Sequence, residues 1–321
     1  MTVKEHILKL LENNRGKYYS GQDIAEEINV SRAAVWKAVK QLQADGYRID
    51  AVSNKGYCMS DDNDIISADS IKKYLTVPIN NIEVYKTVTS TNDLAKQYAL
   101  DLKPEGTVIV AREQTAGRGR KGRSFYSPSS TGVYISVLLR PELTAEKTLY
   151  ITTAAAVAVA KAIEKISGKE AKIKWVNDIF VDGKKVCGIL TEGAIDFETG
   201  KMQYAVLGIG VNIKKPENDF PSEIQNIAGS VFDTTDKEVS SIIVAEILNN
   251  FMNYYKNLAS KPFYEEYKKR MFLIGKHLTV YSGKDSYPAV AIDLDKELSL
   301  IVKDENGNIK KLNTGEVSIK I

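Results

Sequence analysis

The sequence predicts an α+β protein with an N-terminal winged helix-turn-helix, a central α/β domain with a mixed sheet, and a small C-terminal all-β barrel. Three observations predict these parts. Apolar residues recur at helical spacing up to Leu42, strand-like and helix-like segments alternate from residue 82 to 272, and short alternating strands follow His277. We place the domains at 1–62, 63–271 and 272–321.

The first three helices are predicted from apolar spacing and capping residues. Ser20 with Asp23 fits a capping box at the start of the second helix, and Ser31 is the expected N-cap of the third. The short turn through Asn29 between them is typical of a helix-turn-helix. The apolar faces comprise Val3, Ile7, Leu10 and Leu11, then Ile24, Ala25 and Ile28, then Val35, Val39 and Leu42.

Two short strands should follow as a wing, over 46–50 and 53–59, and the acidic run 61–64 is the expected linker. At the other end of the chain, the segments after His277 alternate apolar and polar residues around an Asn306–Gly307 turn. This pattern favours a small all-β barrel.

The central region should contain strands over 82–88, 106–113, 133–139 and 204–213, and helices over 91–102, 145–166, 236–258 and 262–272. Residues 173–175 lead into a hairpin that turns at Asp182–Gly183. The segment 114–130, rich in glycine, arginine and serine, is long for a connection inside a domain. Such a length indicates either a functional loop or a disordered one.

Composition excludes several classes of protein. A net charge of +3 over 321 residues is too small for a general nucleic-acid coat protein. Cys58 and Cys187 lie too far apart in sequence for a zinc motif, and two cysteines do not make a disulfide framework. The N-terminal segment lacks a signal peptide's apolar core, and the longest small-apolar run, 154–160, is too short to cross a bilayer. We therefore expect a protein of the reducing cytoplasm.

The scarcity of histidine bears on mechanism. His6 and His277 are the only two, and neither adjoins a nucleophile motif, so a Ser-His-Asp or Cys-His mechanism is not expected. The sequence has no GxxxxGK[ST] motif, and GIGVN at 208–212 lacks the third glycine of a dinucleotide fingerprint. Any phosphate chemistry must therefore draw its positive charge from a loop.

The GRGRKGR segment at 117–123 is the candidate for that loop. It carries four cations, Arg118, Arg120, Lys121 and Arg123, and its three glycines allow the backbone to approach a ligand closely. The segment fits a lid over an anionic ligand. Taken alone, the segment fits a solvated basic loop or a nucleic-acid patch better than a lid, and the flanking motifs reverse that order.

Several segments together carry a resemblance to a known family. They are SRAAVWKAVKQL at 31–42, TSTND at 89–93, EQTAGRGRKGR at 113–123, KWVND at 174–178, GKKVCGILTE at 183–192, GIGVN at 208–212 and GEVSI at 315–319. In this order and spacing, the chain resembles the biotin protein ligases, in particular the bifunctional members that also repress a biotin operon. It departs from the family pattern at Val176, where proline is usual, and at Phe125, where tryptophan is frequent.

The resemblance implies a biotin–[acetyl-CoA-carboxylase] ligase that makes biotinyl-5′-adenylate from biotin and ATP with Mg²⁺. It implies a catalytic domain of the biotin/lipoate ligase type and an SH3-like C-terminal barrel. The implied catalytic residues are Lys185, Arg118 and Arg120. The implied biotin-binding residues are Ser90, Thr91, Asn92, Gln114, Gly117, Arg118, Arg120, Lys185, Gly188, Gly208 and Gly210, and the adenylate-binding residues are Arg118, Arg120, Arg123, Asn177, Lys185 and Asn212.

Structural roles stay open for several of these residues. Ser90 and Thr91 also fit a plain helix N-cap, and both roles are compatible. Lys185 also fits an exposed lysine that follows a hairpin turn, without any ligand contact. The two glycines of GIGVN also fit a bend in a strand. Asp178 could orient cations or Mg²⁺, or serve in a turn. Trp175 is expected in the sheet core beside the site.

The winged helix is expected to bind operator DNA through Ser31, Arg32, Ala33, Lys37, Lys40 and Lys55, with Arg48 adding a wing contact. Since one short helix covers half an operator, the resemblance implies a homodimer when the adenylate is bound. The implied acceptor is a lysine of biotin carboxyl carrier protein. Two other functions stay open: a transcription factor that senses biotin without transferring it, and a lipoate or octanoate ligase.

Overall fold

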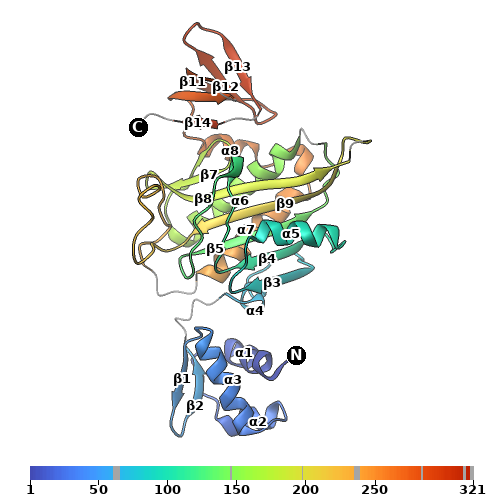
Figure 1. Ribbon diagram of the computed structural model, residues 1–321, viewed down its shortest axis with the longest axis vertical. Helices are drawn as coiled ribbons and strands as arrows, with labels where there is room; N and C mark the ends of the chain where they lie inside the picture. Colours follow the sequence, from blue (N-terminus) through green and yellow to red (C-terminus); the bar gives the residue numbers. More distant parts are fainter. Residues whose placement is uncertain are drawn as a thin grey trace. The chain divides into compact units, whose positions relative to one another are not determined.

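The computed structural model describes residues 1–60, 66–144, 147–196, 198–234, 239–282, 285–313 and 316–318. The predicted linker at 61–64 and both ends of the terminal GEVSI segment lie outside these residues. The chain forms two compact units, one comprising Met1–Tyr74 with Thr234–Ala245 and the other Leu75–Asp233 with Glu246–Ile321 (Figure 1). Among the described helices, none is long and apolar enough to cross a membrane.

The first unit contains the predicted winged helix-turn-helix. Its helices are α1 (Val3–Asn13), α2 (Gly21–Glu27), α3 (Arg32–Ala44) and α4 (Ala68–Lys72), and the wing is the antiparallel pair β1 (Ile49–Val52) and β2 (Gly56–Met59). The capping box of Ser20 and Asp23 is confirmed, and the Ser31 hydroxyl accepts a hydrogen bond from the Ala34 amide at 3.2 Å. The predicted apolar faces of α1, α2 and α3 pack into one core.

A buried carboxylate lies at the edge of this core. Glu12 on α1 is 2% exposed, and its carboxylate accepts a hydrogen bond from the Ser67 hydroxyl at 3.0 Å. Ser70 on α4 in turn contacts Ser241 at 2.7 Å. Burial raises the pKa of the Glu12 carboxyl. The polar network therefore ties α1 and α4 to the start of α7 (Ser240–Tyr255).

The second unit is built on a seven-stranded sheet in the order β3-β4-β5-β9-β8-β7-β6. Only β3 and β4 pair in parallel within it, so the sheet is mixed, as predicted. The strands are β3 (Asn81–Tyr85), β4 (Thr107–Ala111), β5 (Gly132–Leu139), β6 (Lys172–Lys174), β7 (Asp178–Val181), β8 (Lys184–Ile195) and β9 (Met202–Asn212).

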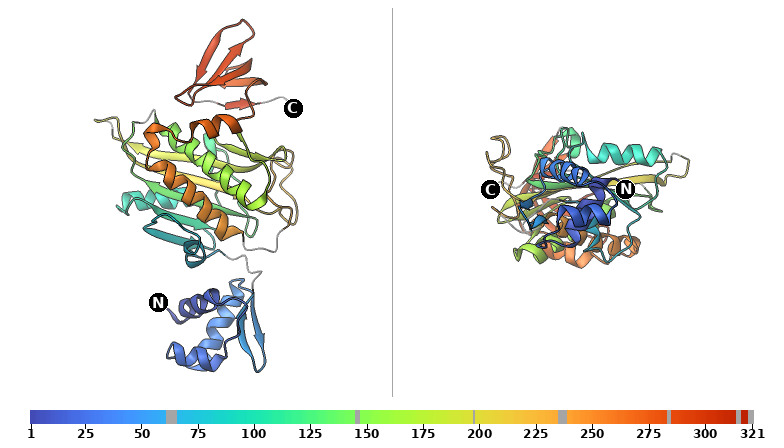
Figure 2. Two further views of the ribbon diagram at one scale, coloured as in Figure 1. Left: turned by 180° about the vertical axis from the view of Figure 1, so that it is seen from behind. Right: turned by 90° about the horizontal axis from the view of Figure 1, so that it is seen from below.

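Helices cover both faces of this sheet. Helix α5 (Thr91–Leu100) packs on one face, where Ala95 and Ala99 meet side chains of β4, β5 and β9. Helix α6 (Thr148–Ser167) lies on the other face, and its residues 154–160 are fully buried (Figures 1 and 2). Their small side chains allow the close approach to the sheet that the sequence predicts. Helix α8 (Tyr264–Arg270) packs against α6.

The C-terminal segment forms a five-stranded antiparallel sheet in the order β13-β12-β11-β10-β14. Its strands are β10 (His277–Ser282), β11 (Asp285–Leu294), β12 (Leu300–Asp304), β13 (Ile309–Leu312) and β14 (Glu316–Ser318). The β12–β13 hairpin turns at the predicted Asn306–Gly307. Because β13 and β14 lie at opposite edges, closure into an SH3-like barrel stays a prediction.

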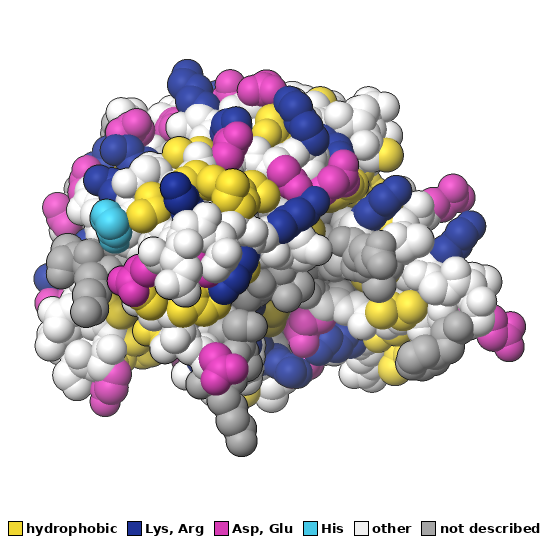
Figure 3. Space-filling view, turned by 90° about the horizontal axis from the view of Figure 1, so that it is seen from above, with side chains coloured by type: hydrophobic (Ala, Val, Ile, Leu, Met, Phe, Trp, Pro, Cys, Tyr) yellow, Lys and Arg dark blue, Asp and Glu magenta, His cyan; other side chains and the backbone are white. Residues whose placement is uncertain are grey.

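The surface carries both signs of charge. Figure 3 shows Lys and Arg side chains interspersed with Asp and Glu over the face that it presents, in keeping with the formal net charge of +3. This face therefore has no broad patch of one charge that would attract an oppositely charged partner. Recognition of a charged ligand must depend on particular clusters of side chains.

Candidate functional site

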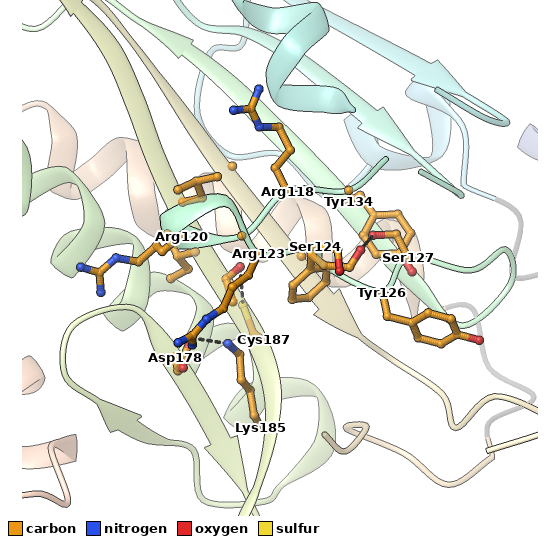
Figure 4. Close-up of a pocket in the computed structure, with 18 of the residues that line it drawn as sticks. Arg118, Arg120, Arg123, Ser124, Tyr126, Ser127, Tyr134, Asp178, Lys185 and Cys187 are labelled. Atoms are coloured by element: carbon orange, nitrogen blue, oxygen red, sulfur yellow. Dashed lines mark hydrogen bonds and ion pairs between the residues drawn. The ribbon is translucent and has the colours of Figure 1, made fainter. Parts of the chain in front are cut away.

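A cavity of about 780 Å³ opens where α5, the loop 114–130 and strands β7, β8 and β9 meet (Figure 4). Residues that the sequence places in separate motifs line this one cavity. The predicted ligand residues among them are Ser90, Thr91, Asn92, Gln114, Gly117, Arg118, Arg120, Arg123, Asn177, Asp178, Lys185, Gly188, Gly208, Gly210 and Asn212. The fold therefore brings together the whole predicted set for biotin and adenylate.

One end of the cavity is a buried hydrogen-bond network. Ser90 caps α5, and the Thr91 amide and hydroxyl donate to Gln114 Oε1 at 2.9 and 3.1 Å. Gln114 Nε2 donates to the Ser127 hydroxyl at 3.0 Å, and the Ser136 and Thr91 hydroxyl oxygens lie 2.8 Å apart. Ser90 thus has the capping role that the sequence left open. Fixed donors and acceptors in a buried position are suited to a small polar ligand group.

Asn92 continues this network across the sheet. Its Oδ1 accepts from the Ser136 hydroxyl at 2.7 Å, and its Nδ2 donates to Glu192 Oε2 at 2.8 Å. A Cβ at Gly208 would lie 2.2 Å from Asn92 Oδ1. Gly208 is therefore required for the close approach of α5 to β9.

Phe125 fills the space beside the other two wall glycines. A Cβ at Gly210 would lie 2.5 Å from its ring, and a Cβ at Gly188 would lie 3.0 Å from it. The same ring makes an edge contact with Tyr134, with 6.4 Å between centroids. The phenylalanine that stands at 125, where the family frequently has tryptophan, thus rests with its ring on the glycine wall.

The GRGRKGR segment folds back on itself as a tight hairpin. Arg118 and Ser124 form an isolated antiparallel β-bridge, and the Gly119 amide donates a hydrogen bond to the Arg123 carbonyl at 2.7 Å. At the turn between them, Lys121 and Gly122 both have a positive φ. A Cβ at Gly117 would lie 2.5 Å from the Phe125 carbonyl oxygen. The glycines thus serve the loop's own turn and packing, in addition to any ligand contact.

The arginines of the hairpin point in different directions. Arg118 points away from the Asp178–Lys185 pair (Figure 4), and its Nη1 lies 2.6 Å from Asp93 Oδ1. The hydrogen bond to Asp93 and the charge of Glu192 raise the pKa of the Arg118 guanidinium. Arg120 Nη1 instead donates to Asn177 Oδ1 at 3.1 Å. Arg120 is therefore already held on the β7 side of the cavity, where Arg123 also points toward Asp178 (Figure 4).

Lys185 faces the cavity from β8. Its ammonium lies 2.6 Å from Asp178 Oδ1, and the two side chains are 29% and 21% exposed. The Lys185 amide also donates to the Ile227 carbonyl at 2.8 Å, and the Asn212 amide group donates to the Gly229 carbonyl at 2.9 Å. Lys185 is thus a fixed, half-buried cation beside a carboxylate, and the alternative of an exposed hairpin lysine is wrong.

Sequence reasoning missed a second wall of the cavity. This wall follows β9 and consists of Phe220, Pro221, Glu223, Ile224, Ile227 and Ala228. Tyr126 makes an edge contact with Phe220 at 6.4 Å between ring centroids. The segment carries no strand or helix periodicity, so only its position after GIGVN gave a signal. Trp175 lines the cavity too, although it is 4% exposed, as expected for a core residue.

The predicted DNA residues lie on the winged helix. Ser31, Arg32, Ala33, Lys37 and Lys40 are exposed on or beside α3, and Lys55 is exposed in the wing turn. The Lys55 ammonium lies 5.8 Å from the centre of the Tyr18 ring. Arg32 and Lys40 are eight residues apart on α3, which places them on the same face. The arrangement fits a recognition helix flanked by a wing.

Comparison with known proteins finds relatives of both regions of the chain. Residues 84–212 match the "Biotin/lipoate A/B protein ligase family" and residues 3–58 match an "HTH domain". The bifunctional ligase/repressor BirA of Bacillus subtilis is 32% identical over 99% of both chains, and that of Escherichia coli is 25% identical over 99% of this chain and 98% of its own.

A search of solved structures also finds biotin protein ligases similar to this chain. A biotin protein ligase from Aquifex aeolicus in complex with biotin and ATP has a TM-score of 0.61 and 26% identity, and the match covers 75% of this chain and 99% of that one. The identity, the coverage and the order of the two matched regions lead to one conclusion. The chain belongs to the family of the bifunctional ligase/repressor BirA.

Proposed function

We propose that the cavity binds biotin and ATP and joins them as biotinyl-5′-adenylate. The carboxylate oxygen of biotin attacks the α-phosphorus of ATP, the bond to the bridging oxygen breaks, and pyrophosphate leaves. The observation that carries the proposal is the convergence of a neutral buried network and a cluster of cations in one cavity. Such a site can hold a polar ring at one end and stabilise developing phosphate charge at the other.

The residues divide the work by their position. Ser90, Thr91, Asn92 and Gln114 bind the polar head of biotin, and Gly117, Gly188, Gly208 and Gly210 form the wall against it. Arg118, Arg120 and Lys185 are the catalytic cations. Arg118 must first leave Asp93, whereas Arg120 and Lys185 are already held on Asn177 and Asp178. Arg118, Arg120, Arg123, Asn177, Lys185 and Asn212 bind the adenylate.

The donor set fits a Mg²⁺ ion that enters with ATP. Magnesium in nucleotide sites uses one or two carboxylates together with substrate phosphates. Asp178 and Glu223 are the carboxylates that line the cavity among the described residues, and Asp178 adjoins Lys185. We therefore propose Asp178 as the ligand. The ion would neutralise phosphate charge, while Lys185 and Arg120 orient the same group.

In the second half-reaction, the neutral amine of an acceptor lysine attacks the carbonyl carbon of the mixed anhydride. An amide forms, AMP leaves and the amine loses a proton. We propose biotin carboxyl carrier protein of acetyl-CoA carboxylase as the acceptor. This step needs no covalent intermediate between biotin and an enzyme side chain. The buried Cys187 thiol, whose pKa is raised by burial, therefore does not have to act as a nucleophile.

We also propose that the winged helix represses a biotin operon in the cytoplasm. Residues 1–62 would bind operator DNA, 63–271 would form the ligase and 272–321 the C-terminal domain. α3 would enter the major groove, and Lys55 would contact phosphate from the wing. The family relatives named bifunctional ligase/repressor support this assignment.

Acid selectivity tests the ligase proposal against a lipoate or octanoate ligase. Pyrophosphate exchange into ATP should depend on biotin and should be far weaker with lipoate or octanoate, because Gln114, Thr91 and Asn92 offer hydrogen bonds that an alkyl chain leaves unmade. Exchange driven equally by lipoate would contradict the assignment. Tight biotin binding without any exchange would indicate a sensor instead.

Arg120→Gly should release the adenylate faster while leaving the fold intact. Arg120 donates a hydrogen bond to Asn177 from an exposed loop, and its charge would hold a bound anion, so the dissociation rate should rise by about tenfold or more. The measurement is adenylate dissociation from the purified complex, with random lysine acylation as a second readout. Lys121→Gly is the matched control, since it removes a cation where φ is +56° and glycine is favourable. Equal rates for Arg120→Gly and wild type would exclude a lid role.

Adenylate should also promote dimerisation and operator binding together. A ligand shifts an association equilibrium only through its different affinity for the two states, and closure of the loop 114–130 changes the protein surface only when the adenylate is present. Sedimentation should therefore move from monomer toward dimer with adenylate, and much less with biotin alone. Operator affinity should rise in parallel. If saturating adenylate changes neither quantity, the coupling proposal is wrong.

A further inference from the structure

Trp36 is a large apolar side chain on the exposed face of α3. It is 56% exposed, whereas Val35 and Val39 on the opposite face are buried in the core of the winged helix. Burying an aromatic ring of this size contributes strongly to stability, so a tryptophan that leaves more than half of its surface in solvent is unusual in a folded domain. Packing within the winged helix does not account for it.

Long cationic side chains flank Trp36 on the helix surface, and the small Ala33 lies beside it at i−3. Arg32 and Lys40 lie one turn before and one turn after it, at i−4 and i+4, so the three side chains share one face. Lys37 follows directly and is exposed as well. Among the described residues, none forms a salt bridge with Arg32, Lys37 or Lys40. The ring is therefore the apolar centre of a positively charged face.

We infer that Trp36 reads the C5-methyl group of a thymine in the major groove of the operator. The cations at its two sides match the phosphates that border the groove, and the N-terminal turns of a recognition helix are the part that reaches base edges. Thymine alone offers a methyl group there, and apolar side chains are the ones that recognise it. This inference rests on the proposed DNA-binding role of α3 and adds a specificity determinant to it.

Chemistry favours this occupant over a protein surface. A docking site for another protein would place apolar residues next to one another, but the side chains flanking Trp36 along its face are the cations Arg32 and Lys40. Both long cationic side chains are suited to the paired phosphate strands of duplex DNA, which lie on either side of the groove.

The test begins with a duplex obtained by in vitro selection, using the full chain with biotin and MgATP. Each thymine of that duplex is then replaced, one at a time, by deoxyuridine, which lacks only the methyl group. For the wild type, one position in each half-site should lose about three- to fivefold in affinity, as expected for one buried methyl group. Trp36→Ala should bind the parent duplex more weakly than wild type does. Replacing the thymine at that position by deoxyuridine should not reduce the affinity of Trp36→Ala any further.

Three controls make the result decisive. Trp36→Phe should restore part of the methyl dependence, and the circular dichroism and thermal unfolding of Trp36→Ala should match those of wild type, which establishes that the winged helix of the variant folds. Lys37→Ala should weaken binding to every duplex by a similar factor and leave the deoxyuridine pattern unchanged.

The outcomes separate this inference from the DNA-binding proposal. An identical deoxyuridine pattern in wild type and Trp36→Ala overturns the reading of thymine by Trp36. So does an equal loss by Trp36→Ala on selected and scrambled duplexes. If Arg32→Ala and Lys40→Ala also leave affinity for the selected duplex unchanged, α3 is not the recognition helix and the DNA-binding proposal fails.

Discussion

Lys185→Ala should reduce biotinyl-adenylate formation by about a hundredfold or more, because it removes a preorganised cation from the site of phosphate charge development. Asp178 and the Ile227 carbonyl hold Lys185 in place before any ligand arrives, so little reorganisation is needed at the moment of reaction. The side chain is also only 29% exposed, which limits screening of its charge by water. The measurement is the single-turnover rate of adenylate formation with saturating biotin and MgATP.

Lys172→Ala is the matched control for this variant. Lys172 belongs to the same sheet, but its side chain is 51% exposed and pairs with Glu170 instead of lining the cavity. It should retain the wild-type rate. A near-normal rate for folded Lys185→Ala would remove Lys185 from the catalytic residues. The proposed role of Asp178, as a Mg²⁺ ligand beside Lys185, would then lose its support as well.

Removing residues 1–62 should abolish operator binding and leave adenylate formation largely intact. The deletion takes away α1, α2, α3 and both wing strands, whereas every residue that lines the cavity lies between Ser90 and Ala228. Operator affinity is measured by fluorescence anisotropy and adenylate formation by the same single-turnover assay. Operator binding that survives the deletion would place the DNA site elsewhere in the chain.

Truncation also removes Glu12, the hydrogen-bond acceptor of Ser67, so part of any lost ligase activity would come from a disturbed α4. Charge reversal avoids this problem. Arg32→Glu with Lys40→Glu changes two exposed side chains and leaves the core of the winged helix untouched. The double variant should lose operator binding and keep full ligase activity. A comparable loss of both activities would show that the two functions share a structural requirement.

Local rules predicted most of the winged helix and the sheet from the sequence. The capping box at Ser20 and the cap at Ser31 depend on neighbouring residues, and each appears where the sequence placed it. The loop 114–130 was marked by its length and its glycines. The convergence of Ser90, Gln114 and Lys185 on one cavity depends on how the strands order in the sheet, and that came only from the family resemblance.

Other features escaped prediction because their causes are nonlocal. Glu192 resembles any strand glutamate in the sequence, yet it receives hydrogen bonds from Lys96 and Asn92. Although burial raises the pKa of the Glu192 carboxyl, these partners outweigh it and the net pKa is lowered. The wall around Phe220 lacks periodicity, and the seating of Phe125 on Gly210 depends on two glycines that face each other across the β8–β9 pair. No local pattern encodes such contacts.

The most direct test of the central claim is the product of the first half-reaction. The full chain is incubated with biotin, ATP and Mg²⁺, and the acid-quenched mixture is analysed by mass spectrometry, with biotin omitted in a parallel sample. We predict biotinyl-5′-adenylate at about one equivalent per active chain, together with released pyrophosphate. Absence of the adenylate from a folded protein that still binds biotin would contradict the assignment of the cavity as a ligase site.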